Sequence, residues 1–488
     1  MTITRRTFIE SALAAVATPC GLSAAEAPIL KFGLMSDTHL TTSSSTSTLL
    51  AQFRHLSEQG VRLVLVTGDV VDLGILPEVR RFRSVWDEAF PSGKNAFGEP
   101  CRLFVCWGNH DYHDRAWFAD NGYGEEVWAE AIANGENRNE AWRILMDEDF
   151  PGENSILTVD GVTFVTAHWG HFGDELAPFL SAHAAEIPTD RPVFFLQHSH
   201  PHMTCYGNWY AKTNSGANAT TLGAHPNFFV MSGHSHISNV ANDALWMGKF
   251  VSMGAGRSSG SSGRNFYSWV KGLREYNTSS QSETYGLKHM GDVDWGRCDM
   301  ANIITVYPSR VVVRRREYSH GLDLDPWDIP FPFHHDADNP YPFIAQAKPP
   351  QFPADVSGKV RLSYRQSNLY PLKAANGTKA GQVRLDFPVA AGDGPHSQII
   401  DYLVSVRRKG ADDVILDRLV AQPYAYGTDA ERAQAGAWVV FGRDELPQGE
   451  DLIATITPLD AIGCFNGRGG EPITFEFRLP RPVVSYLK

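Results

Sequence analysis

Short hydrophobic runs alternate with amphipathic stretches along the first part of the chain. Three of these runs are rich in β-forming residues and predict strands, namely ILKFGLM (29–35), VRLVLVTGD (61–69) and RLFVCW (102–107). Residues 46–59, and a second stretch that starts near Pro77, place apolar side chains at helical spacing between the runs. This β-α-β-α-β order predicts an α/β domain that contains a parallel sheet with helices on both faces.

Further apolar runs extend this domain to about residue 324. Residues 114–150 look largely helical, and five more strands are predicted at 155–159, 162–169, 192–198, 227–234 and 249–255. Residues 302–307 and 310–318 are typical of a hairpin, with Pro308 and Ser309 in its turn.

The pattern changes after residue 324. Residues 325–354 are rich in Pro and aromatic residues and are interpreted as a linker. Residues 355–488 carry short alternating segments separated by turn residues, which is typical of an antiparallel β-sandwich of the immunoglobulin or fibronectin type III kind. The chemistry-bearing residues described below all precede this second domain.

Residues 1–27 have the three regions of a secretory signal peptide. Arg5 and Arg6, followed by Phe8, resemble a twin-arginine signal, which implies the twin-arginine export machinery as a partner and a periplasmic or secreted protein. A general export signal or an ordinary N-terminal helix are the alternatives, and Cys20 as a lipid attachment site is disfavoured by its flanking residues. Because no other apolar run approaches about 18 residues, we expect a soluble mature protein without a membrane span.

Composition narrows the possible partners. The net charge of −12 and pI near 5.8 argue against stable binding to nucleic acid, although a small phosphorylated substrate is still compatible. The five cysteines after residue 27 cannot all pair within one chain, so buried free thiols are expected, with one disulfide left unassigned. The oligomeric state is not indicated.

Five predicted strands end in residues that commonly bind metals. These strand ends carry Asp37 and His39, then Asp69 and Asp72, then Asn109, His110 and Asp111, then His198, His200 and His202, and finally His234 and His236. In an open parallel sheet the carboxyl ends of the strands meet at one rim, where sites form. Mixed Asp, Asn and His donors suit Fe, Mn or Zn rather than Ca.

The order D-x-H, G-D-x-x-D, G-N-H-D, H and G-H-x-H resembles the calcineurin-like metallophosphoesterases, which include purple acid phosphatases and class III cyclic nucleotide phosphodiesterases. The resemblance covers about residues 29–318 and implies a four-layer αββα sandwich around two metal ions. It implies seven ligands, which are Asp37, His39 and His236 for the first metal, Asn109, His198 and His234 for the second, and Asp69 as the bridge. His198 is preferred over His200 and His202 because it directly ends its strand.

The resemblance also implies a reaction. A hydroxide that bridges the metals would attack phosphorus in line, and His110 is the candidate proton donor to the leaving group. Asp111 is expected to orient His110, and Asp72 either orients another ligand or caps a turn. Either a phosphodiester or a phosphomonoester would be hydrolysed, with the diester slightly preferred.

Other functional assignments rest on weaker patterns. Candidate substrate contacts are Tyr206, Trp209, Arg257 and Arg264, while His168 and His171 are interpreted as structural. The alternative function is a secreted binding or adhesion protein that uses its C-terminal sandwich and carries a relic or narrow-specificity phosphoesterase domain. Loss of a metal ligand would favour that alternative, and none of the five motifs has lost one.

Overall fold

The computed structural model describes most of the chain. The described residues are 26–205, 215–236, 239, 242–258, 299–318, 321–356, 358–365, 382–392, 394, 396–397, 399, 401–421, 437–442, 445–459 and 469–479. Tyr206, Trp209, Arg264 and nearly all of the expected signal peptide lie outside them.

The first large sheet has the strand order β12-β11-β10-β1-β2-β3, and β13 also pairs with β11. Its strands are β1 (Leu30–Met35), β2 (Leu63–Thr67), β3 (Arg102–Cys106), β10 (Met300–Val306), β11 (Arg310–Glu317), β12 (Leu322–Asp323) and β13 (Trp327–Pro330). β1, β2 and β3 are parallel, as the sequence predicts. β10 and β11 form the predicted antiparallel hairpin.

The second large sheet has the order β4-β5-β6-β7-β9-β8. Its strands are β4 (Asn154–Val159), β5 (Val162–Ala167), β6 (Val193–Leu196), β7 (Phe228–Ser232), β8 (Leu245–Trp246) and β9 (Val251–Gly254). The four central strands, β5, β6, β7 and β9, are parallel, and an antiparallel strand closes each edge.

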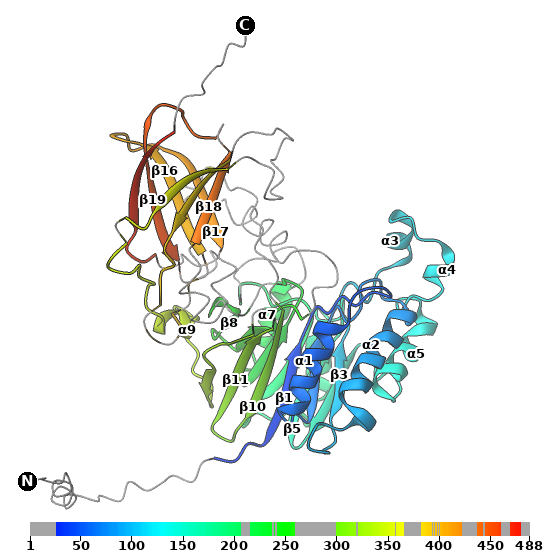
Figure 1. Cartoon of the computed structure of the whole chain (residues 1–488). Helices are drawn as coiled ribbons and strands as arrows, with labels where there is room; N and C mark the ends of the chain where they lie inside the picture. The colour runs from blue at the N-terminus through cyan, green and yellow to red at the C-terminus, as the bar shows by residue number, and fades with distance from the viewer. Residues whose placement is uncertain are drawn as a thin grey trace, which may run out of the picture.

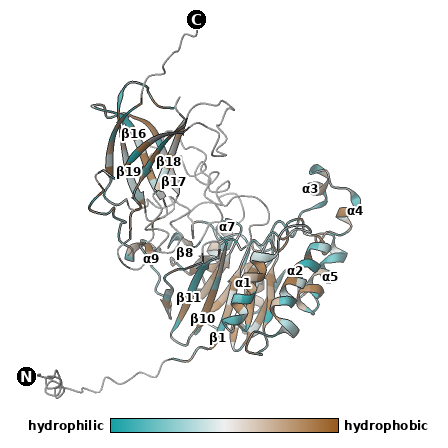
Figure 2. Cartoon of the chain, in the orientation of Figure 1, coloured by the Kyte–Doolittle hydropathy of each residue, from teal (hydrophilic) through white to brown (hydrophobic). Residues whose placement is uncertain are grey.

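The two sheets pack face to face. The Phe32 ring of β1 lies 5.3 Å from Phe164 of β5 and 5.0 Å from Phe194 of β6. The helices of the described residues therefore cover the outer face of each sheet, which corrects the expectation of helices on both faces. The hydrophobic residues concentrate in the strands, and the helices show both hydrophobic and hydrophilic stretches (Figure 2).

The helices complete a four-layer arrangement (Figure 1). The described helices are α1 (Ser47–Glu58), α2 (Leu76–Ala89), α3 (Arg115–Asp120), α4 (Glu125–Trp128), α5 (Gly135–Met146), α6 (Leu176–Ala182), α7 (Ser215–Leu222) and α9 (Pro342–Gln346), with short 3₁₀ turns η1 (Pro91–Gly93) and η2 (Asn242–Ala244). Phe53 of α1 and Phe82 of α2 belong to the core of the first sheet, whereas Leu176 and Leu180 of α6 belong to the core outside the second. The fold is thus an α/β type with two mixed sheets.

The interpretation of residues 325–354 as a linker is wrong for their first part. β13 pairs with β11, and its Trp327 and Ile329 are buried. Further on, the Tyr341 hydroxyl donates to the carbonyl of Thr204 at 2.7 Å. These residues therefore belong to the first domain, because their apolar side chains are packed into its core.

The C-terminal strands form two smaller antiparallel sheets around a separate core. One contains β14 (Arg361–Arg365), β15 (Gln382–Phe387) and β18 (Ala437–Gly442), and the other contains β16 (Asp401–Arg408), β17 (Val414–Ala421), β19 (Asp451–Leu459) and β20 (Ile473–Arg478). An all-β region was expected here, although β17 was not anticipated. This body lies beyond α9 from the two large sheets (Figure 1).

Two further findings concern the described part of the chain. Cys101, Cys106 and Cys205 are buried free thiols, as expected, and the other cysteines lie outside the described residues. No helix among the described residues combines the length and the apolar character needed to cross a membrane.

Glu78 anchors the loop that follows β2. This residue lies in the first turn of α2, is buried, and accepts a hydrogen bond from the backbone N–H of Leu73 at 2.8 Å. Burial, with a smaller effect from the Asp72 charge, raises the pKa of Glu78 from 4.5 to about 7. Its folded-state pKa therefore exceeds its unfolded value.

Substituting Glu78→Gln should remove a pH-dependent part of the stability. Protonated Glu78 contributes stability that is fully present below pH 4.5 and is lost as pH rises through about 7. Between pH 5 and 8 the free energy of unfolding of the wild type should fall by roughly 2 kcal/mol relative to Glu78→Gln. Urea unfolding of both proteins at the two pH values, with chelator present, measures this difference. Parallel pH profiles would contradict it.

Candidate metal centre

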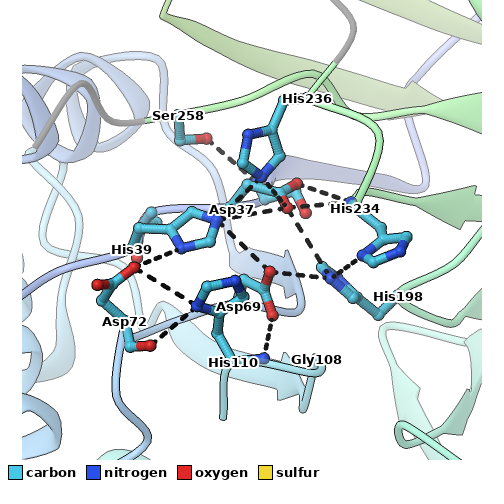
Figure 3. Close-up of polar contacts among 12 residues, drawn as sticks. Asp37, His39, Asp69, Asp72, Gly108, His110, His198, His234, His236 and Ser258 are labelled. Carbon is cyan, nitrogen blue, oxygen red and sulfur yellow. Dashed lines mark hydrogen bonds and ion pairs between the residues drawn. The ribbon is translucent and has the colours of Figure 1, made fainter. Parts of the chain in front are cut away.

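The five predicted strand ends converge at one rim of the two sheets. Each candidate residue follows its strand by a few positions, β1, β2 and β3 coming from the first sheet and β6 and β7 from the second. Figure 3 shows side chains that point toward one another, namely those of Asp37, His39, Asp69, His198, His234 and His236. Two groups of potential donors share a member, and these are Asp37, His39, Asp69 and His236, and Asp69, His198 and His234.

In the first group, two ring nitrogens and two carboxylates meet. His39 Nε2 lies 2.9 Å from His236 Nε2, and His236 Nε2 lies 3.2 Å from Asp37 Oδ1. His39 Nε2 lies 3.4 Å from Asp69 Oδ2. Donors about 2.0–2.2 Å from one ion lie about 3–3.5 Å from one another, so most of these separations suit a common cation.

The second group uses the same carboxylate oxygen. His198 Nε2 lies 3.1 Å from Asp69 Oδ2 and 3.2 Å from His234 Nδ1. Asp69 Oδ1 instead accepts the backbone N–H of His110 at 2.9 Å. One oxygen of Asp69 is thus held by the protein, while the other faces histidines of both groups, as a bridging ligand would.

Asn109 supplies the remaining expected donor position. Its Oδ1 is buried and has no hydrogen-bond partner among the described residues. Its neighbour Gly108 packs against Asp69 and His198, since a Cβ at position 108 would lie 2.2 Å from Asp69 Oδ1 and 2.9 Å from His198 Cδ2. An unpartnered buried amide oxygen beside Asp69 fits a role as a neutral metal ligand.

The ligand backbones are strained. Five candidate ligands adopt positive φ, which non-glycine residues seldom do, namely Asp37 (52°), His39 (42°), Asp69 (48°), His234 (65°) and His236 (54°). Each such residue costs of order 1–3 kcal/mol and persists only where surrounding contacts enforce it. One such contact is the backbone N–H of His234, which donates to the Asp37 carboxylate at 3.0 Å.

Two of the histidines are held in the tautomer that a metal requires. The Nδ1 of His198 donates to the carbonyl of Thr67 at 2.7 Å, which leaves Nε2 to face Asp69. The Nδ1 of His39 contacts Asp72 Oδ1 at 3.0 Å, so Asp72 is placed to orient this ring. Such outer partners fix the ring and raise its basicity.

His198 is the protonated histidine that partly compensates the charge of the buried carboxylates. Burial raises the pKa of Asp37, but His236 and His198 outweigh it and hold the value at about 2. Burial lowers the pKa of His198, but Asp69 and Asp37 outweigh it and raise the value to about 9. Burial lowers the pKa of His39 to about 4 and that of His234 well below its usual range. A protonated His198 thus offsets the buried carboxylates, which is also what a bound cation would do.

The environment of His110 differs from the expectation in one respect. Its Nδ1 donates to the carbonyl of Asp72 at 2.9 Å and lies 3.5 Å from Asp72 Oδ1. Asp111 was expected to orient His110, and the structure corrects this expectation. The Asp111 carboxylate instead accepts hydrogen bonds from the backbone N–H groups of Val70, Val71 and Gly108. Asp111 therefore joins two loops of the rim, and Asp72 orients His110.

The other expected residues are not members of the two donor groups. His200 and His202 belong to neither group, and burial lowers the pKa of His200 to about 3. Arg257 is buried just beyond β9, one residue before Ser258, whose hydroxyl accepts the Ser36 N–H at 3.1 Å. His168 accepts the backbone N–H of Trp107 at 2.9 Å, which agrees with its structural interpretation.

Sequence reasoning missed Trp169. Its ring centroid lies 5.8 Å from that of His198 and 5.2 Å from that of His234. The available signal was its position as the last residue of the predicted strand 162–169, at the carboxyl end where sites form.

Comparisons with known proteins agree with this geometry. Residues 30–238 match the model of the calcineurin-like phosphoesterase family. No curated protein matches the chain. The two donor groups share Asp69 and fit a binuclear metal centre, in agreement with the expected cofactor of two metal ions.

Several solved structures are distantly similar. A dimetal phosphatase from Danio rerio has 12% identity and a TM-score of 0.36, and the match covers 62% of this chain and 100% of that one. The purple acid phosphatase PPD1 from yellow lupin seeds has 10% identity and a TM-score of 0.40, covering 62% of this chain and 53% of that one. The structure of PhoD has 12% identity and a TM-score of 0.35, covering 60% and 66%. With TM-scores below 0.5, these likenesses carry no argument about activity.

Metal binding should release about one proton from the protein at pH 7.5. His198 is protonated there in the metal-free protein because its pKa is about 9, and it must lose that proton to act as a ligand. Calorimetric titration with Mn²⁺ in buffers of different ionisation enthalpy counts the protons. His198→Gln should release about one proton fewer. Heats of the wild type that do not depend on the buffer would contradict the prediction.

Proposed function

We propose that this chain is an exported, binuclear metal-dependent phosphoesterase that hydrolyses phosphodiesters or phosphomonoesters by in-line attack of water on phosphorus. The observation that carries the proposal is the shared oxygen of Asp69, which lies 3.4 Å from His39 Nε2 and 3.1 Å from His198 Nε2. The match of residues 30–238 to the calcineurin-like phosphoesterase family supports phosphoester hydrolysis in general. The donor set of Asp, Asn and His suits Fe, Mn or Zn.

The metal pair, when bound, would lower the pKa of an attacking water and neutralise charge on the phosphoryl oxygens. Hydrolysis forms one P–O bond to that water and breaks the P–O bond to the leaving alcohol, whose oxygen must gain a proton. His110 is the proposed donor. Because its Nδ1 is engaged by the Asp72 carbonyl, its Nε2 is the atom that would deliver the proton.

The arrangement couples the proton donor to the first donor group. Asp72 contacts His39 through its carboxylate and His110 through its carbonyl, and the rings of His39 and His110 lie 4.4 Å apart in an edge-to-face arrangement. Asp72 is therefore a positioning residue that sets His110 relative to a ligand. General acid catalysis from such a position contributes roughly 10²–10⁴-fold to the rate.

Export and substrate contacts belong to the same proposal. The twin-arginine pattern supports export of the folded protein, which suits an enzyme that loads its metals first. Arg257, together with Tyr206, Trp209 and Arg264 outside the described residues, stays a candidate for substrate contact. No specific observation favours the alternative of a binding or adhesion protein, since none of the five motifs has lost a residue.

Substituting His110→Ala should lower kcat about 10²–10⁴-fold while two metal equivalents stay bound, because His110 moves a proton and is not among the proposed ligands. Asp69→Ala should lose both metal and activity. Assays with 4-nitrophenyl phosphate and bis(4-nitrophenyl) phosphate, in the presence of Mn, Fe or Zn, measure turnover, and elemental analysis measures metal content.

His183→Ala is the matched control, because His183 is partly exposed beyond α6 and contacts Glu186. It should keep wild-type activity. Full activity in His110→Ala would remove His110 as the proton donor. Two tightly bound metals in Asp69→Ala would overturn its role as the bridge.

A further inference from the structure

The second donor group is covered on one side by an aromatic side chain. Trp169 lies within 6 Å, centroid to centroid, of both the His198 and His234 rings. The two histidines are 0% and 5% exposed, whereas Trp169 is only partly buried. Of the three side chains, the indole is therefore the most exposed to solvent.

The indole is held in place by the protein. The backbone N–H of Trp169 donates to the carbonyl of Trp107 at 3.0 Å, which ties it to the strand end that carries Asn109. The ring of Phe172 packs against it at 5.8 Å and 68°. An aromatic side chain that neighbouring contacts already hold in place loses little conformational entropy when it binds a planar group.

The two ends of the site differ in chemistry. Beside the first donor group stand His110, the proposed proton donor, and Asp72, which positions it. Beside the second stands Trp169. A phosphoester whose leaving oxygen reaches His110 has its other substituents free to point toward the second group. In a monoester those substituents are only oxygens, whereas a diester places an organic group there.

We propose that Trp169 contacts the organic group that stays on phosphorus, so that the preferred substrate is a phosphodiester whose retained group is planar, such as an aryl or nucleoside group. This inference rests on the proposed function and deepens it. Stacking of a base on an aromatic side chain commonly changes affinity by about 10-fold or more. Trp169 is thereby a specificity-determining residue, and its packing on His198 and His234 is not its whole role.

Three esters with the same leaving group test the proposal. Bis(4-nitrophenyl) phosphate retains an aryl group, methyl 4-nitrophenyl phosphate retains a methyl group, and 4-nitrophenyl phosphate retains none. Trp169→Ala should raise KM for the first about 10-fold, and change KM for the other two by less than about threefold. Trp169→Phe keeps an aromatic face and should restore most of the loss.

Trp246→Ala is the matched control. Trp246 of β8 is also partly buried, but it packs on Phe250 and belongs to neither donor group. It should leave all three KM values unchanged. Metal content is measured for every variant. Equal losses of Trp169→Ala on all three esters, with or without lost metal, would mean that Trp169 only positions the histidines and would overturn the proposal.

A binding measurement separates this proposal from the proposed function. Phenylphosphonate and methylphosphonate carry a P–C bond that hydrolysis does not break, so each mimics a retained group. By calorimetry, the metal-loaded wild type should bind phenylphosphonate about 10-fold more tightly than methylphosphonate, and Trp169→Ala should bind both alike. Preferential binding of phenylphosphonate without turnover of any ester would contradict the proposed function but not the role of Trp169. Turnover of the esters without preferential binding of phenylphosphonate would contradict the role of Trp169 but not the proposed function.

Discussion

A buried carboxylate, Asp69, is the constraint on which the site depends. It is 1% exposed, and burial of an unpaired charge costs several kcal/mol unless hydrogen bonds and opposite charges compensate it. The compensation comes from separate strand ends, through the His110 N–H and the rings of His39 and His198. Loops that are distant in sequence must therefore approach one side chain closely.

That close approach explains the local sequence around Asp69. Gly68 has φ +100°, and a Cβ there would lie 2.1 Å from His198 Nδ1. The loop from β2 can pass beneath the His198 ring only because this position carries no side chain. The positive φ values of Asp37, Asp69 and His234 are the accompanying backbone strain, and the bound metals would contribute part of the energy that sustains it.

The segment that contains Asp325 and β13 has a structural role that its Pro-rich and aromatic composition did not indicate. The Arg315 guanidinium stacks on Trp327 at 4.0 Å and donates to the carbonyls of Asn239 and Asp325. Asp325 in turn accepts the backbone N–H of His396 at 2.9 Å. Polar contacts thus run from the loop beyond His236, through β11, to the C-terminal body, and attach that body to the domain that carries the site.

The sequence by itself determined the α/β order, the β10–β11 hairpin and the side chains that meet at the rim, because strand periodicity and the ends of parallel strands are local properties of the chain. It did not reveal β17, where the buried Asp417 interrupts the apolar run and accepts a hydrogen bond from the Ser405 hydroxyl of the neighbouring strand. It placed β13 in a linker, because the pairing of β13 with β11 is not encoded in its own residues. Only the tertiary structure decided that Asp72, and not Asp111, holds His110, and that Trp169 lies against two histidines. Those contacts depend on how loops from two sheets pack together, and no spacing along the chain specifies that distance.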